Sequence, residues 1–238
     1  MQYSEAAFKD LKERVYEANM RLYRSGLVPL TFGNVSEKFL LEDGDYVIAI
    51  KPSGVAYEQL RPQDIVIVAS NGTAAPGSLR PSSDTPTHLQ VYALLPQWSG
   101  VTHTHSTFAT AWAQSGRAIP ILGTTHADYL PCAVPCTLPM ARADIVGAYE
   151  HNTGSHMVAH LVAVGASDSP MALVHGHGPF TFGSSAAASV DASIALEEIA
   201  KSTYYALSIN PTAAPISQDL IDRHYLRKHG AQKYYGQN

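Results

Sequence analysis

The sequence is organised around one short segment, Val101-Thr102-His103-Thr104-His105-Ser106. It follows a glycine, and its β-branched residues favour an extended backbone, in which side chains two residues apart point to the same face. We therefore expect His103 and His105 to point in the same direction. Two imidazoles that converge from one strand are the start of a zinc, iron or manganese site, which a third histidine and a carboxylate would complete. Because such a pair also occurs on ordinary polar sheet faces, other segments must decide between these two interpretations.

The overall composition fits a globular chain and excludes several classes of protein. With 238 residues, 45% of them hydrophobic, residues 1–238 are expected to form a single domain. The net charge is −4 without a basic run, which argues against a nucleic-acid partner. No stretch approaches the ~18 apolar residues of a membrane span and the N-terminus does not look like a signal peptide, so we expect a cytoplasmic protein without membrane contact. Cys132 and Cys136 are too few for a disulfide framework and are expected to be reduced thiols, whereas eleven histidines are an excess.

Two other segments can complete a metal site with the first histidine pair. The apolar stretch 171–174 runs into a second His-x-His pair, His175 and His177, of which only one is needed as a ligand. Asp84 precedes a helix that is expected to end near residue 95. An aspartate at this position is usually only a helix cap, and it becomes a candidate ligand if the fold brings it to the histidine face.

Three segments suit an anionic ligand such as a phosphate. The strand 46–50 runs into Lys51-Pro52-Ser53-Gly54, which offers a positive charge, a hydroxyl and a glycine amide, although an ordinary turn with a solvated lysine has the same sequence. Ser82 and Ser83 come just before Asp84 and the helix that follows it. The N-terminus of a helix binds phosphate readily. A glycine and an asparagine interrupt the extended segment 30–36, where the backbone can approach a ligand. The candidate substrate-binding residues are Gly33, Asn34, Lys51, Ser53, Gly54, Ser82 and Ser83.

Hydrophobic periodicity predicts helices that alternate with strands. An amphipathic helix capped by Ser4 should end at Gly26 and bury Leu11, Val15, Ala18 and Leu22. Further helices are expected over residues 107–116, 143–150, 186–207 and 217–229, and strands over residues 46–50, 64–69, 101–106, 119–122 and 171–180. The helix 186–207 should serve as a scaffold, with Glu197 and Glu198 on a side other than the core. Residues 151–168 show no clear pattern.

Six segments taken together resemble the class II aldolase family. They are Gly33-Asn34-Val35-Ser36, Lys51-Pro52-Ser53-Gly54, Pro81-Ser82-Ser83-Asp84-Thr85-Pro86-Thr87-His88, His103-Thr104-His105-Ser106, Gly123-Thr124-Thr125-His126-Ala127-Asp128-Tyr129 and His175-Gly176-His177-Gly178-Pro179-Phe180. The likeness continues through residues 222–230 and 234–236. It implies a three-layer α/β/α fold with a mainly antiparallel central sheet, and a homotetramer with active sites between neighbouring subunits.

The resemblance also implies a role for each motif residue. The implied ligands of a zinc ion, with manganese or cobalt as alternatives, are Asp84, His103, His105 and His177. The residues in the glycine, serine and lysine motifs fall on phosphosugar-binding positions. Asp128 and Tyr235 match two acid/base residues, and Tyr235 would reach in from the adjacent subunit. Secondary positions of open role are Thr124, Glu150, His224 and Arg227.

The implied reaction is the epimerisation of L-ribulose 5-phosphate, a small phosphorylated ketopentose, to D-xylulose 5-phosphate. The hydrogen on C4 is not acidic enough for a base at neutral pH, so breaking the C3–C4 bond, turning the aldehyde and re-forming the bond is the easier route. Zinc would act as a Lewis acid in this scheme. The pathway stays open between arabinose and ascorbate breakdown.

Two other functions compete with this one. An aldolase of the same family would release the aldehyde, but such aldolases carry glutamate at the position of Asp84. A non-catalytic interaction module would keep the fold without the metal ligands, and this chain retains all of them.

Overall fold

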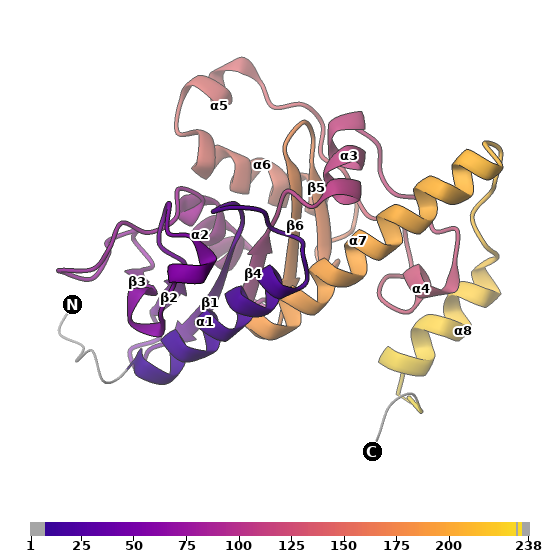
Figure 1. Cartoon of the computed structure of the whole chain (residues 1–238). Coiled ribbons are helices and arrows are strands. Elements are labelled where there is room, and N and C mark those ends of the chain that lie inside the picture. The colour runs from indigo at the N-terminus through magenta and orange to yellow at the C-terminus, as the bar shows by residue number, and fades with distance from the viewer. Residues whose placement is uncertain (1–7, 232, 235–238) are drawn as a thin grey trace.

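In the computed structural model, which describes residues 8–231, 233 and 234, one six-stranded sheet forms the centre of the molecule (Figure 1). The strands lie in the order β3-β2-β1-β4-β6-β5, and each of the five pairs is antiparallel. Their bounds are β1 Asn34–Leu40, β2 Tyr46–Ile50, β3 Val66–Ala69, β4 Gly100–His103, β5 Met171–Val174 and β6 Gly178–Gly183. The segment that carries the first histidine pair thus lies in the middle of the sheet.

Helices cover both faces of the sheet, which confirms the predicted three-layer fold. On one face lie α2 (Thr85–Leu94) and α6 (Tyr149–Ala163), and on the other α1 (Lys9–Arg24), α3 (Thr107–Ser115) and α7 (Ala186–Ile209). The alternation of side chains along β2 supplies both cores, because Ile48 and Ile50 pack toward α2 and α6 while Val47 and Ala49 pack toward α1. Two short 3₁₀ helices, Tyr57–Gln59 and Pro62–Asp64, connect β2 to β3.

Several predicted elements are present with nearly the predicted bounds. The strand β2 begins and ends where expected, and α1 buries the four apolar residues that predicted it, Leu11, Val15, Ala18 and Leu22. The proposed cap Ser4 lies outside the described residues. Both cysteines are free thiols, and burial raises their pKa, that of Cys136 to about 11.

Three predictions about elements were wrong. The segment 119–122 makes only a single bridge, between Ile119 and Val134, and is not a strand. The helix predicted over 143–150 is split, because Gly147 has a ψ of −135° that ends α5 (Arg142–Val146), and α6 then continues through the unassigned region. The single strand predicted over 171–180 is a hairpin of β5 and β6.

At one end of the molecule, a pair of helices packs together beyond the sheet. The long helix α7 extends past the sheet and leads to α8 (Gln218–His229), which returns beside α4 (Thr124–Ala127) (Figure 1). Ile121, Ala127 and Ile221 form the small core between them. We call α4, Asp128 and α8 together the α4–α8 arm.

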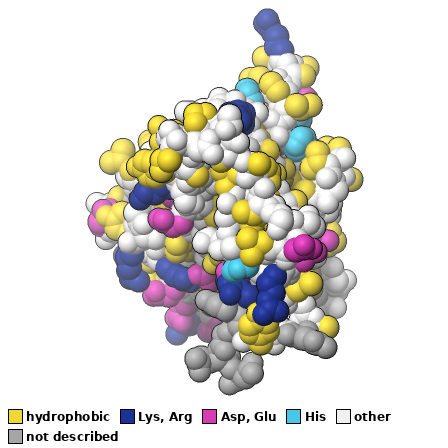
Figure 2. Space-filling model, turned by 90° about the vertical axis from the view of Figure 1, so that its right-hand side faces the viewer, with side chains coloured by type: hydrophobic (Ala, Val, Ile, Leu, Met, Phe, Trp, Pro, Cys, Tyr) yellow, Lys and Arg dark blue, Asp and Glu magenta, His cyan; other side chains and the backbone are white. Residues whose placement is uncertain are grey.

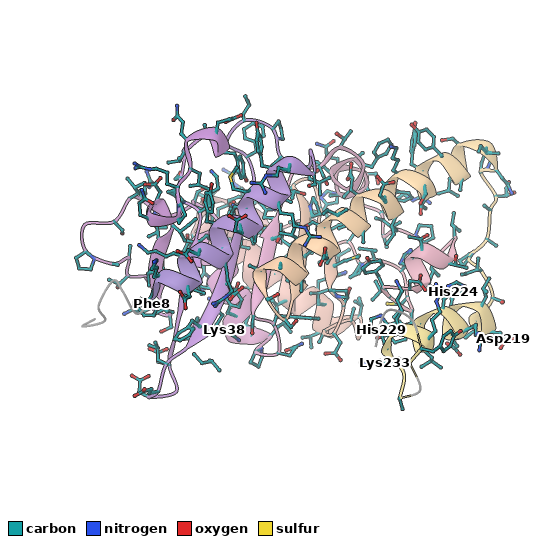
Figure 3. The ribbon with its side chains drawn as sticks, turned by 60° about the horizontal axis from the view of Figure 1, so that its bottom comes forward. Phe8, Lys38, Asp219, His224, His229 and Lys233 are labelled. Carbon is teal, nitrogen blue, oxygen red and sulfur yellow. The ribbon has the colours of Figure 1, made fainter. Side chains whose placement is uncertain are left out.

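The arm lies far from the first strands of the sheet. Figure 3 shows Asp219, His224 and His229 of α8 at the end of the molecule opposite Phe8 and Lys38. On the face turned to the viewer in Figure 2, where the arm lies, lysine and arginine side chains gather in the lower part.

Of the helices described, none combines the length and the apolar character that a membrane span requires.

Candidate active site

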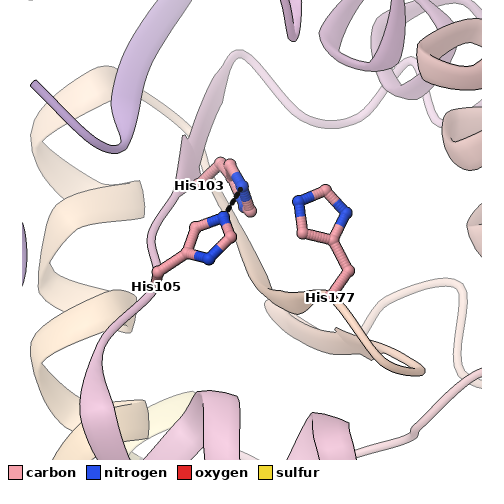
Figure 4. Close-up of side chains that lie close together, drawn as sticks. All are labelled: His103, His105 and His177. Atoms are coloured by element: carbon pink, nitrogen blue, oxygen red, sulfur yellow. Dashed lines mark hydrogen bonds between the residues drawn. The ribbon is translucent and has the colours of Figure 1, made fainter.

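Three histidines from two parts of the chain converge in the structure (Figure 4). His103 ends β4 between β1 and β6, His105 follows it, and His177 lies in the turn between β5 and β6. Their potential ligand atoms all lie within 4.8 Å of one another, and the two Nε2 atoms of His103 and His105 are 3.1 Å apart. His103 and His105 therefore point the same way, as predicted. His175 is not in this cluster, because its ring packs against Gly116.

The surroundings of His103 prepare it as a metal ligand. A carbonyl oxygen can only accept a hydrogen bond, so the 2.9 Å contact with the oxygen of Pro179 places the proton of His103 on Nδ1. The lone pair of Nε2 is then directed toward the other histidines. The ring of His103 stacks on Phe180 with centroids 4.2 Å apart, and burial lowers the pKa of His103 to about 3. His103 is therefore neutral at neutral pH, which is the form that binds metal.

The cluster fits a divalent transition-metal ion. Burial also lowers the pKa of His105 and His177, so all three imidazoles can offer a lone pair. In a tetrahedral site with metal–nitrogen bonds of 2.0–2.1 Å, neighbouring nitrogens lie about 3.3 Å apart, close to the separation of the two Nε2 atoms. His177 has a further contact, 3.4 Å from its Nδ1 to the hydroxyl of Tyr149. Three histidines facing a cavity leave a coordination position free for a substrate.

Asp84 lies beside the cluster and is not a helix cap in the usual sense. It precedes α2, but its side chain makes no capping hydrogen bond; Oδ2 instead accepts one from Asn34 Nδ2 at 2.6 Å. Burial favours the neutral carboxyl, but the nearby His103 and His88 and the hydrogen bond from Asn34 outweigh it and hold the pKa of Asp84 below its usual value. The carboxylate is therefore ionised next to the three imidazoles.

A cavity of about 430 Å³ opens over the cluster. Besides Thr31, Phe32 and Pro52, it is lined by every candidate metal and substrate residue in the order of the chain: Gly33, Asn34, Lys51, Ser53, Gly54, Ser82, Ser83, Asp84, His103, His105 and His177. Two loops form one wall, because Ser53 N–H donates to the carbonyl of Arg80 and Ser82 N–H to that of Lys51. The cavity thus combines convergent imidazoles with hydroxyl and amide groups that suit a phosphorylated ligand.

Lys51 lies beneath this cavity as a buried cation. Its side chain is nearly inaccessible, with 1% of the residue exposed, and its Nζ donates to the carbonyl of Val55 at 2.7 Å and faces the ring of Tyr57 at 4.7 Å. Burial lowers the pKa of Lys51 to about 8. The hydroxyl of Tyr57 in turn donates to the carbonyls of Phe32 and Gly33. The interpretation as a solvated lysine in an ordinary turn is therefore wrong.

Asp128 lies on the α4–α8 arm and not among the residues that line the cavity. Its carboxylate accepts hydrogen bonds from Arg227 at 2.7–3.0 Å and from His224 at 3.0 Å, and Lys228 lies 3.4 Å away. Burial alone would raise the pKa of Asp128, but the bonds from Arg227 and His224 outweigh it and hold that pKa below its usual value. Tyr235 lies outside the described residues.

The comparisons with known proteins agree with the motifs. The model of the family described as Class II Aldolase and Adducin N-terminal domain matches residues 13–204. The chain belongs to the class II aldolase family. A three-histidine metal site is typical of class II aldolases, and the cluster of His103, His105 and His177 has that form.

Relatives and solved structures of class II aldolases cover nearly the whole chain. The protein named L-ribulose-5-phosphate 4-epimerase UlaF from Salmonella paratyphi C (strain RKS4594) is 47% identical over 227 residues, which are 95% of this chain and 98% of that protein. Among solved structures, an L-fuculose 1-phosphate aldolase has a TM-score of 0.73 at 20% identity and covers 93% of this chain and 95% of its own. The l-fuculose-1-phosphate aldolase from Thermus thermophilus has a TM-score of 0.64 at 24% identity, covering 87% and 98%. The two aldolase structures are evidence of the fold alone.

The sequence motifs of a class II aldolase did not reveal every residue at this site. Tyr149, whose hydroxyl contacts His177, begins α6 in a segment where the helix boundary was predicted wrongly. Only its position next to Glu150, which was itself of open role, pointed to it. Glu150 lies at the same helix start, and its carbonyl accepts a hydrogen bond from Thr87. Thr124 is the first residue of α4 on the arm.

Proposed function

We propose that this protein epimerises L-ribulose 5-phosphate at C4 and forms D-xylulose 5-phosphate. The observation that carries the proposal is 47% identity over 95% of the chain to a protein named for this activity. The cavity supports it, because it unites three neutral imidazoles with serine, glycine and lysine residues suited to a phosphorylated sugar. The solved aldolase structures are too distant in sequence to favour aldol cleavage as the net reaction.

The metal ion in this proposal is zinc, held by His103, His105 and His177 with Asp84 as a fourth ligand before substrate binds. Three neutral nitrogen donors and one ionised carboxylate are a donor set that zinc accepts. When bound, the ion would supply Lewis-acid stabilisation of the negative charge that develops on the substrate as the C3–C4 bond breaks. Asn34 has a positioning role, since its amide holds the Asp84 carboxylate at the edge of the cluster.

The phosphate of the substrate would bind between the two loops that form one wall of the cavity. Ser53, Gly54, Ser82 and Ser83 offer hydroxyl and amide groups there. Lys51 would not bind the phosphate directly, because its ammonium donates to the backbone carbonyl of Val55. Its positive charge would attract the phosphate through the loop that carries Ser53 and Gly54. Holding the phosphate keeps the aldehyde fragment in the cavity while it turns over.

Epimerisation requires proton transfer at both faces of that aldehyde, and we assign the two transfers to Asp128 and Tyr235. One removes the proton of the C4 hydroxyl as the bond breaks, and the other protonates the oxygen when the bond re-forms on the opposite face. Because Asp128 is ionised on the arm and does not line the cavity of its own chain, we propose that the arm of a neighbouring subunit reaches each cavity. A homotetramer with active sites between subunits would provide this arrangement. A cytoplasmic location is part of the same proposal.

Incubation with L-ribulose 5-phosphate tests the proposal, with D-xylulose 5-phosphate and free glycolaldehyde phosphate measured separately. We expect D-xylulose 5-phosphate as the product, with little free aldehyde, and loss of the reaction on removal of the metal by a chelator. His103→Ala serves as a control for contaminating activity. Accumulation of glycolaldehyde phosphate without D-xylulose 5-phosphate would instead identify an aldolase.

A further inference from the structure

The helix that follows the metal strand has no local cap. Ser106 occupies the N-cap position of α3, where a serine hydroxyl normally accepts a hydrogen bond from the second or third backbone N–H of the helix. Its side chain makes no such bond, and its hydroxyl instead accepts from Thr104 Oγ1 at 3.2 Å. The first N–H groups of α3 must therefore find an acceptor elsewhere.

A carboxylate from a distant helix supplies that acceptor. Glu197 of α7 accepts hydrogen bonds from Phe108 N–H at 2.8 Å and from Ala109 N–H at 2.9 Å, one at each carboxylate oxygen. These are the second and third residues of α3, the positions that a local cap would serve. Glu197 is 9% exposed, and its negative charge also opposes the positive end of the helix dipole. The expectation that Glu197 lies on a side of α7 away from the core is thus wrong.

This contact lies next to His105 in the chain. The strand β4 ends at His103, so His105 has no partner in the sheet ladder, and its position depends on the segments before and after it. The segment after it is the start of α3, only two residues on. Among the three histidines, His103 is fixed by the sheet and Pro179, and His177 lies in the β5–β6 turn next to Tyr149. His105 is the member whose backbone is anchored through α3.

We propose that Glu197 is a positioning residue for the metal site, which acts by anchoring the start of α3 and thereby holding His105 in place for ligation. The proposal rests on the binding of a metal ion by the three histidines, as proposed above. Glu197, a residue of the scaffold helix α7, would thus support metal binding without contacting the metal or the substrate.

Affinity for Zn²⁺, measured by competition with chelating indicators, tests the proposal without relying on activity. Glu197→Gln keeps the shape of the side chain but leaves one helix N–H without an acceptor and removes the charge. Loss of a contact that orients a metal ligand typically weakens affinity about 10- to 100-fold, and we expect a loss in this range. The matched control is Glu198→Gln, the neighbouring exposed glutamate on the same helix, which should bind Zn²⁺ as the unmodified protein does.

Double-mutant cycles separate positioning of His105 from a general weakening of the fold. If Glu197 acts through His105, Glu197→Gln should have little further effect on Zn²⁺ affinity in a His105→Ala background, but its full effect in a His177→Ala background. Equal effects in both backgrounds would overturn the proposal, and so would Zn²⁺ affinities of Glu197→Gln and Glu198→Gln that do not differ.

Two further measurements keep these outcomes distinct. Circular dichroism and thermal unfolding of the metal-free variants verify that each is folded, and Glu197→Asp, which keeps the charge but is one methylene shorter, replaces Glu197→Gln in the same cycles if the latter does not fold. If the unmodified protein binds no Zn²⁺, the proposed metal site itself fails. If it binds Zn²⁺ and the cycles show no selectivity for His105, only the role of Glu197 fails.

Discussion

His103 is prepared for metal binding by contacts that do not involve the metal. Its Nδ1 proton is held by the carbonyl of Pro179, its ring stacks on Phe180, and burial keeps it neutral by lowering its pKa to about 3. These contacts come from β6, the strand that pairs with β4. The ring should therefore keep its orientation in the metal-free protein, because its position is set by the sheet and not by the ion.

His103→Ala should remove the bound metal and the activity together and leave the fold largely intact. The site is an open cavity beside a sheet that has cores on both faces, so its metal is not needed to fold the chain. Metal content per subunit, the epimerase rate and circular dichroism measure the three effects. His175→Ala is the matched control, since this histidine of the second pair lies outside the cluster and should keep both metal and activity. A metal-free His103→Ala variant with full activity would contradict the assignment.

Lys51 should make stability depend on pH in the alkaline range. Its pKa is about 8 in the folded protein but about 10.4 in an unfolded chain, so between these values the unfolded state binds more protons and stability rises with pH. Below pH 8 both states are protonated and the contribution is constant. The free energy of unfolding of the unmodified protein, relative to Lys51→Met, should increase by roughly 3 kcal/mol from pH 8 to above 10. Urea unfolding of both proteins across this range measures it, and parallel curves would show that Lys51 is not a buried cation.

Asp84→Glu tests how closely the carboxylate is matched to the metal cluster. The added methylene moves the carboxylate away from its hydrogen bond with Asn34 and changes how it approaches the three histidines. We expect slower epimerisation and a larger share of released glycolaldehyde phosphate, which the two-product assay measures. Unchanged turnover with an unchanged product ratio would indicate that Asp84 has no part in the chemistry.

Which side chains come together at this site could be predicted where local sequence motifs determine it. It could not be predicted where a turn or a distant residue determines it. Alternation along an extended backbone predicts, without tertiary information, that His103 and His105 lie on one side, and their rings do converge although β4 ends at His103. The residue pattern left the choice between His175 and His177 open, because the β5–β6 turn interrupts the alternation there, and only the family resemblance selected His177. The residues around Asp84 also could not show whether it is only a helix cap. Its carboxylate is bound by Asn34, which lies fifty residues earlier in the chain.

At the scale of elements, the start of β1 depends on one glycine beside the metal strand. Gly33 has a φ of +71°, and a Cβ there would lie 2.5 Å from Val28 Cγ1 and 2.8 Å from the carbonyl oxygen of His103. The side chain of Val28 can shift, but the backbone of β4 cannot move without displacing the histidine. The close approach of β1 to β4 at the cavity therefore requires glycine.

Gly33→Ala should be more destabilising than Gly54→Ala, although both glycines have nearly the same backbone strain. Gly54 has a φ of +70° with open space around the added carbon, so its substitution should cost only the left-handed conformation, about 1–2 kcal/mol. Gly33→Ala adds overpacking, roughly a further 1–3 kcal/mol. Denaturant unfolding of the two variants gives the difference directly. Equal losses of stability would mean that β1 can move away from β4 at no cost.

Elements with a clear period were predictable, and elements interrupted by their surroundings were not. The helix α1 shows its buried face through four apolar residues at helical spacing, and β2 has a hydrophobic run bounded by turn residues. In contrast, the segment 119–122 has strand-like composition, but the one β-bridge described for it joins Ile119 to Val134, and Ile121 instead accepts a hydrogen bond from Ile216 N–H. The break between α5 and α6 comes from the backbone conformation of Gly147, which hydrophobic periodicity cannot predict.

At the scale of the whole molecule, the candidate catalytic groups lie in two separate places. The histidine cluster lies in the cavity over the sheet, whereas Asp128 lies on the α4–α8 arm, bound to Arg227 and His224 of the same chain. Tyr235 follows α8 by six residues in the sequence. A cavity in one copy and an arm from another would form complete sites in a closed assembly such as the homotetramer proposed above.

Mixing inactive variants tests this arrangement, after dissociation and reassembly with mass spectrometry to confirm hybrids. His103→Ala inactivates the cavity of its subunit, and Asp128→Asn inactivates the arm. In equal mixtures about one quarter of the sites should combine an intact cavity with an intact arm, and the rate should recover to about one quarter of that of the unmodified protein. Tyr235→Phe mixed with His103→Ala should recover likewise. Tyr235→Phe mixed with Asp128→Asn should stay inactive, because both changes damage the same arm and no hybrid site receives an intact one. Recovery in this last mixture, with no recovery when His103→Ala is mixed with Asp128→Asn, would instead place Asp128 at the cavity of its own chain, against its position in the structure.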